Sequence, residues 1–181
     1  MMLTITIPAT EEFDEVKGEF VYVKAQTLQL EHSLLSISKW ESKWCKSFLS
    51  KQDKSPEEII DYIKCMTLNK PVNDDVYGCL SQANLIEIND YISAPMTATY
   101  FSDQDNGRKN REPITSELIY YWMISLNIPF ECQKWHINRL LTLIRVCNVK
   151  NSPPKKMSKR EITQRNAALN AARRQQLNSK G

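Results

Sequence analysis

The sequence predicts a mainly α-helical fold, made of a helical body with a small N-terminal antiparallel β-sheet and a basic C-terminal helix. Three observations support this prediction. Apolar residues recur at intervals of three and four over most of the chain, which is the spacing of one helix face. Residues 3–7 instead alternate between apolar side chains and threonine, which is typical of a half-buried strand. Only four glycines are present, and tight turns in a large sheet would need more.

We expect two parts in the chain. Residues 1–150 form a globular body, in which residues 1–31 are the β element and residues 32–150 are helical. Residues 151–181 form a basic linker and a C-terminal helix. A chain of 181 residues is long enough for one domain with its own core and such an appendage.

The β element is expected to contain three strands and an acidic loop at residues 9–19. Alternating side chains and breakers such as Pro8 place the strands at residues 3–7, 20–24 and 27–31. A sheet this small is unstable alone, so a helix is expected to pack on it.

Apolar spacing predicts six helices in the body. Their expected positions are 33–49, 55–68, a short helix from 73, 84–92, 115–126 and 132–150. The clearest start is Ser55, because a proline and two glutamates follow it and Glu58 can complete a capping box. Trp40 and Trp44 share one side of the first helix, where aromatic residues at this spacing usually pack in the core.

Two hexamers in different predicted helices are nearly identical. Residues 58–63 read EIIDYI and residues 87–92 read EINDYI. The similarity stops at the edges of both segments. We therefore interpret them as two amphipathic helices of similar pattern and not as an internal repeat.

The net charge of the chain changes sign near residue 133. Residues 1–133 carry 12 Lys+Arg and 20 Asp+Glu, whereas residues 134–181 carry 12 Lys+Arg and one acid, Glu161. The candidate partner-binding residues are Lys155, Lys156, Lys159, Arg160, Arg165, Arg173 and Arg174. Such a density of cations fits an acidic protein surface, including this body or a second copy, or the phosphate backbone of a nucleic acid. A solvated tail without a partner is the third interpretation.

No local pattern predicts catalysis. The sequence has no G-x-S-x-G, no H-E-x-x-H and no phosphate-binding P-loop, so we expect no enzyme and no cofactor. Cys132 and His136 lie four residues apart, but no second pair exists, and core packing is favoured over a metal site. The five scattered cysteines are expected to be buried thiols. The longest apolar run, residues 118–124, is far shorter than the ~20 residues that span a bilayer, so no membrane contact is expected.

Several segments are similar as wholes to one protein family. They are LQLEHSLLSISKWESKW at 28–44, APMTATYF at 94–101, and PFECQKWHINRLLTLIRVCNVKN at 129–151 with PPKKMSKRE behind it. Together they resemble the tail assembly chaperones encoded in the tail-morphogenesis region of long-tailed bacteriophages. The resemblance extends over nearly the full chain, without a catalytic motif.

The resemblance implies a mainly helical protein in the cytoplasm of the infected host. Such a protein would bind the tape measure protein, keep it soluble and help tail tube proteins polymerise around it, and it could form a homo-oligomer. The leading hypothesis is thus a non-enzymatic assembly factor that acts through helix-in-groove contacts and a basic C-terminal arm. The alternative is a structural protein of the virion, such as a head–tail connector or a minor tail protein. A small nucleic-acid-binding protein is the third hypothesis.

Overall fold

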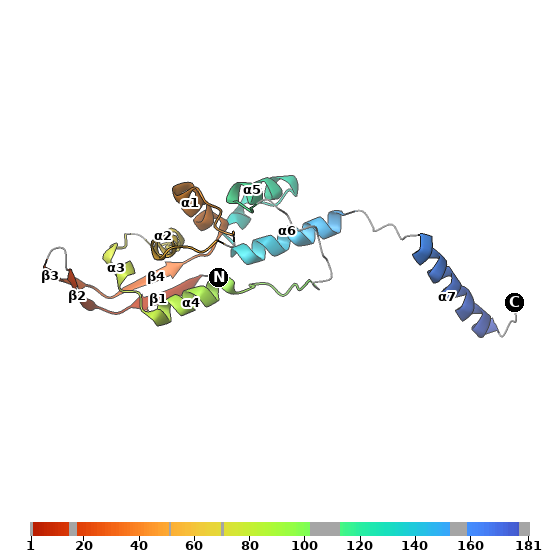
Figure 1. Cartoon of the computed structure of the whole chain (residues 1–181), viewed down its shortest axis with the longest axis horizontal. Helices are drawn as coiled ribbons and strands as arrows, with labels where there is room; N and C mark the ends of the chain where they lie inside the picture. Colours follow the sequence, from red (N-terminus) through yellow and green to blue (C-terminus); the bar gives the residue numbers. More distant parts are fainter. Residues whose placement is uncertain are drawn as a thin grey trace. The chain divides into compact units, whose positions relative to one another are not determined.

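The computed structural model describes residues 2–14, 18–50, 52–69, 71–101, 113–152 and 159–177. The chain divides into two compact units, residues 1–148 and residues 149–181. The division falls in the last turn of helix α6 (Ile137–Asn151), and the smaller unit contains helix α7 (Lys159–Leu177). Helices account for most of the described structure, and the predicted mainly α-helical class is confirmed (Figure 1).

Four strands form an antiparallel ribbon in two segments. The strand β1 (Leu3–Ile7) pairs with β4 (Gln26–Leu30), and β2 (Thr10–Asp14) pairs with β3 (Glu19–Val23). The predicted acidic loop is therefore wrong over β2. The charged residues of β2 are compatible with a strand because each strand of a two-stranded pair has an open edge, where charged residues are common.

Both segments of the ribbon share one register. Ile7 lies opposite Gln26 and Thr10 lies opposite Val23, so two residues on each side separate the segments without changing the alignment. The segment β2–β3 thus continues the ribbon past the helices of the body (Figure 1). Phe20 on β3 is highly exposed there.

One face of the pair β1–β4 carries the start of the core. Its buried residues are Ile5, Ile7, Leu28 and Leu30, and the opposite face exposes threonines and Gln29. Alternation of this kind is typical of an antiparallel sheet that is covered on one side. The helix α2 (Pro56–Met66) contacts β4, and α4 (Gln82–Ser93) contacts β1.

Capping chemistry defines where the helices of the body begin. Ser55 accepts a hydrogen bond from the Glu58 N–H, and the Glu58 carboxylate accepts one from the Ser55 N–H, so the predicted capping box is present. Ser33 and Ser81 start α1 (Leu34–Trp44) and α4 with similar boxes. The remaining elements are α3 (Asp75–Gly78), α5 (Ser116–Ser125) and the 3-10 helix η1 (Phe130–Lys134).

Two predicted helices are shorter in the structure. The helix α1 ends at Trp44 and not near residue 49, because Cys45 takes a left-handed conformation with φ 52°. The helix predicted over 132–150 begins only at Ile137. His136 forms an isolated β-bridge with Ser33, and the Ile137 N–H donates to the His32 carbonyl at 2.9 Å, so the chain is extended just before α6.

Among the described residues, no helix combines the length and the apolar character that crossing a membrane requires.

Candidate functional site

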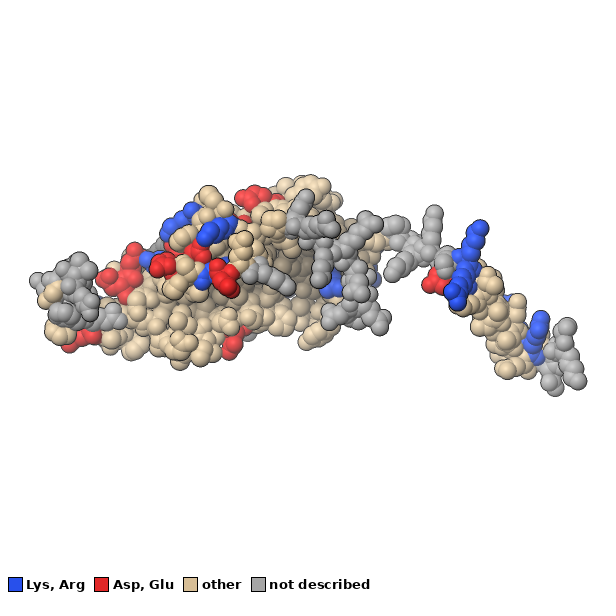
Figure 2. Space-filling model, viewed as in Figure 1, with Lys and Arg blue, Asp and Glu red and all other residues tan. Residues whose placement is uncertain are grey.

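Helix α7 carries most of the cations that the sequence singled out. Lys159, Arg160, Arg165, Arg173 and Arg174 all lie on it, and Lys155 and Lys156 lie outside the described residues. No residue of α7 is buried. Figure 2 shows Lys and Arg side chains near both ends of this helix. The structure therefore brings five of the seven predicted residues onto one exposed helix.

The cations of α7 are unevenly distributed around the helix. With 3.6 residues per turn, the first two and the last two of them fall within a sector of about 140°. Arg165 lies outside that sector, on the side that also carries Ile162 and Leu169. These two apolar side chains are 45% and 47% exposed, so the helix presents a narrow apolar stripe beside a basic face.

The body contains an apolar groove that could receive a partner. It has a volume of about 480 Å³ and is lined by α2, α4 and the segment 48–54. Ile59 and Ile63 come from α2, and Ile88 and Ile92 come from α4. These are the second and sixth residues of the two similar hexamers, so both hexamers line the same groove.

The helices that line this groove are acidic. The helix α2 contains Glu57, Glu58, Asp61 and one cation, Lys64, whereas α4 contains Glu87 and Asp90 and no cation. Lys54 lies at the groove as well, but its ammonium sits over the Phe48 ring at 4.6 Å from the centroid. None of these acids lines the groove itself, whose charged lining residues are Asp53 and Lys54.

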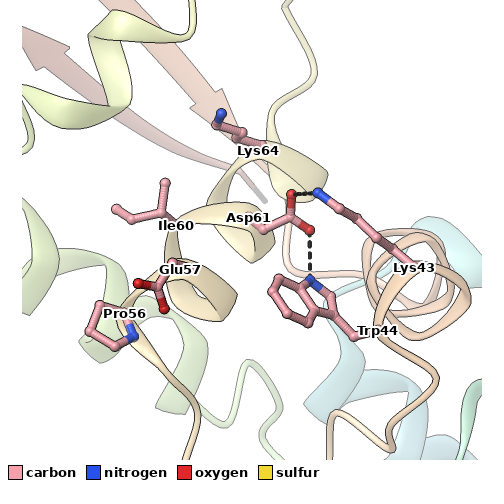
Figure 3. Close-up of a pocket in the computed structure, with 7 residues that line it drawn as sticks. All are labelled: Lys43, Trp44, Pro56, Glu57, Ile60, Asp61 and Lys64. Atoms are coloured by element: carbon pink, nitrogen blue, oxygen red, sulfur yellow. Dashed lines mark hydrogen bonds and ion pairs between the residues drawn. The ribbon is translucent and has the colours of Figure 1, made fainter. Parts of the chain in front are cut away.

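A second concavity of about 530 Å³ lies between the end of α1 and the start of α2 (Figure 3). Three of its polar side chains, Lys43, Trp44 and Asp61, are paired with one another. The Trp44 Nε1–H donates to Asp61 at 2.9 Å, and Lys43 forms an ion pair with the same carboxylate. Burial raises the pKa of Asp61, but the hydrogen bonds from Lys43 and Trp44 outweigh burial and hold this pKa below its usual range. The arrangement joins α1 to α2 and engages both oxygens of the Asp61 carboxylate.

His136, which the sequence placed beside Cys132 as a weak metal candidate, is a buried core residue. Its Nε2–H donates to the Tyr91 carbonyl at 3.0 Å, and its Nδ1 accepts from the Asn138 N–H at 3.3 Å. Burial lowers the pKa of His136, so the ring is neutral at pH 7. Within the described ranges no group of three or more His, Cys, Asp or Glu side chains could hold a metal ion.

The cysteines differ in their surroundings. Cys132 is buried, and burial raises the pKa of its thiol. The expectation of buried thiols is wrong for Cys45, which is exposed where it caps the C-terminal end of α1, and Cys65, Cys79 and Cys147 are only partly buried.

Comparisons with known protein families, with curated proteins and with solved structures found no match for this chain.

The basic helix α7 was predicted from the sequence, whereas the groove between α2 and α4 was not. The two hexamers were visible as a pattern, and the pattern alone does not show that Ile59 and Ile88 meet at one surface. That requires the fold, since 29 residues separate the two positions.

Proposed function

We propose that this protein is a non-enzymatic tail assembly chaperone of a long-tailed bacteriophage, which binds the tape measure protein and promotes tail tube assembly around it. One observation carries the proposal. Helix α7 has 19 residues, five cations and one acid, and buries no side chain. A helix gains most of its stability from packing an apolar face, so a helix that buries no side chain within the described structure is suited to docking on a partner.

The groove of the body supports the same proposal. An amphipathic helix binds by placing its apolar face in such a groove, with anchors three, four and seven residues apart. A tape measure protein, as the segment resemblance implies, is a long helical chain that aggregates when its apolar faces are exposed. If the α2–α4 groove and the basic C-terminal arm cover those faces, the tape measure protein would stay soluble in the host cytoplasm, where we place the protein.

Co-expression with the tape measure protein of the same phage tests this function. We expect the tape measure protein to become soluble and to co-purify with the full chain. A triple variant, Arg160→Gln, Arg173→Gln and Arg174→Gln, should lose co-purification. Its matched control removes the same amount of positive charge from three exposed lysines of the body. The control substitutions are Lys24→Gln, Lys39→Gln and Lys134→Gln.

The two sets remove equal positive charge, so a general charge effect would weaken both. A tape measure protein that stays insoluble and unbound beside the wild-type chain would contradict the proposal. Mass spectrometry of purified particles separates a chaperone from a structural protein of the virion. A chaperone is absent from the particle, whereas a connector or minor tail protein is present in a fixed copy number.

The exposed cations of α7 also favour a second candidate function, non-specific binding to a nucleic acid backbone. The helix carries no aromatic side chain for stacking on bases, so any such binding would depend on phosphate alone. A titration of the protein with duplex DNA at rising salt tests it. The absence of affinity at low salt would eliminate this function.

A further inference from the structure

We infer that strand β1 of one copy pairs antiparallel with strand β1 of a second copy, so that the two β1–β4 pairs join into one continuous sheet. The occupant of the open β1 edge is thus a second copy of this chain. The inference does not depend on the tape measure protein or on any other phage component.

The outer edge of β4 is already covered by the chain that follows α2. The Leu68 N–H donates to the Gln29 carbonyl at 2.8 Å. The Asn69 side chain accepts from the Gln29 N–H at 2.8 Å and donates to the Thr27 carbonyl at 2.7 Å. Thr27 and Gln29 therefore direct these backbone groups away from β1.

The outer edge of β1 is open in the described structure. Thr6 and Thr4 of β1 lie opposite Thr27 and Gln29 of β4. Opposite residues of an antiparallel pair either exchange both hydrogen bonds or both direct their backbone groups outward, so the backbone N–H and C=O groups of Thr4 and Thr6 point away from β4. Among the described residues these groups have no hydrogen-bond partner, and both threonines are exposed.

The sequence of β1 is complementary to itself. Antiparallel pairing of two copies about Ile5 places Thr4 opposite Thr6 of the second copy. Leu3 then lies opposite Ile7 of the second copy, so apolar residues meet on the buried face and threonines meet on the exposed face. Each pair of Thr4 and Thr6 exchanges two backbone hydrogen bonds, so the open groups of one copy are satisfied by the same groups of the other.

Charge does not oppose this pairing. Natural edge strands commonly avoid association by carrying charged residues or a proline. The strand β1 contains neither, so no like charges lie opposite each other across the contact. A two-fold axis uses the same strand from both copies, and the contact therefore closes and leaves no β1 edge for a third copy.

Light scattering of the purified full chain during size exclusion, over a dilution series, tests the inference. We expect a dimer for the wild type. The double variant Thr4→Lys and Thr6→Lys places lysines directly opposite lysines and should raise the dissociation constant by about tenfold or more. Its matched control, Thr27→Lys and Gln29→Lys, adds the same charge to the same exposed face, on β4 and away from the open edge. The control should leave the dimer intact.

Amide hydrogen exchange of the wild-type chain measures the contact without any substitution. We expect the Thr4 and Thr6 amides to exchange more slowly at high protein concentration than at low concentration, because only the dimer supplies their acceptors. Exchange rates that do not depend on concentration would contradict the inference.

Mixing two charged variants provides the decisive measurement. A second double variant, Thr4→Glu and Thr6→Glu, should also be monomeric alone, because it places like charges opposite each other. Mixed with the lysine variant, it pairs opposite charges across the same contact, and we expect a heterodimer. A monomeric wild type, or a dimer that the lysine variant leaves intact, would overturn the inference. Two charged variants that gain nothing from mixing would overturn it too, since a dimer formed through another surface would behave that way.

Discussion

The imidazole rings of His32 and His136 meet edge to face in the core, with their centroids 4.9 Å apart. A tyrosine extends this contact on each side. The Tyr62 ring lies 5.8 Å from His32, and the Tyr91 ring lies 5.1 Å from His136. The two tyrosines occupy equivalent positions in the two similar hexamers. The pair of histidines therefore joins α2 and α4 to the two segments that carry the histidines. His32 lies between β4 and α1, and His136 lies just before α6.

Acidification should destabilise the protein through these histidines. Burial, together with the neighbouring His136, lowers the pKa of His32 from 6.5 to about 3. Between these two pH values the unfolded chain binds a proton that the folded chain does not bind. The free energy of unfolding should thus fall as the pH drops below 6.5, with a slope for this histidine that approaches about 1.4 kcal/mol per pH unit near pH 5. Urea unfolding at several pH values measures the slope.

His136 adds to this slope in the same direction, because burial lowers its pKa as well. A His32→Gln variant removes one of the two groups and should show a smaller slope than the wild type. Equal slopes in the two proteins would show that His32 already binds its proton in the folded state.

The carboxylate of Glu41 should be a major determinant of stability. It is 7% exposed and accepts hydrogen bonds from the backbone N–H of Phe48 at 2.8 Å and of Ser116 at 2.7 Å. Glu41→Ala leaves both donors unpaired and should cost about 2–4 kcal/mol of the free energy of unfolding. Glu41→Gln keeps one acceptor and should cost about half. Glu87→Ala, on the exposed side of α4, should change the value by about 0.5 kcal/mol or less.

The two tryptophans of α1 should differ in their contributions. Trp40 is 1% exposed and donates its Nε1–H to the Glu58 carbonyl at 2.9 Å, whereas Trp44 is only partly buried. Trp40→Ala should cost about 3–5 kcal/mol, and Trp44→Ala should cost less because its site is open to solvent. Thermal unfolding followed by circular dichroism measures both. A larger loss for Trp44→Ala would contradict the core position of Trp40.

A chain truncated after Asn151 should keep a folded body. The buried core residues of the described structure all lie between Ile5 and Ile144, and α6 ends at Asn151. We expect the melting temperature to stay within a few degrees of the full-length value, while partner binding is lost. If the truncated body is unfolded, helix α7 contributes to the core and the two-part organisation is wrong.

Local signals in the sequence predicted the elements whose conformation is decided locally. The capping box at Ser55 is present, and the N-cap of α5 is Thr115, whose side chain accepts from the Leu118 N–H. Elements decided by distant partners were predicted less well. The strand β2 exists because it pairs with β3, and α6 starts late because Ser33 holds His136 in a bridge.

The candidate site shows the same difference between features decided locally and features decided by distant partners. The cations of α7 could be read from the sequence because density of charge is a local property. The groove could not, because its walls come from α2 and α4, which only the fold brings together.

The acidic residues of the ribbon have a consequence for solubility. Four of the ten residues in β2 and β3 are acidic. A two-stranded ribbon has two open edges, and each edge offers unpaired N–H and C=O groups to any other extended chain. Charged residues in edge strands oppose such pairing. We therefore expect the acidic residues that made this segment look like a loop to disfavour edge-to-edge pairing of β2 and β3 between neighbouring copies.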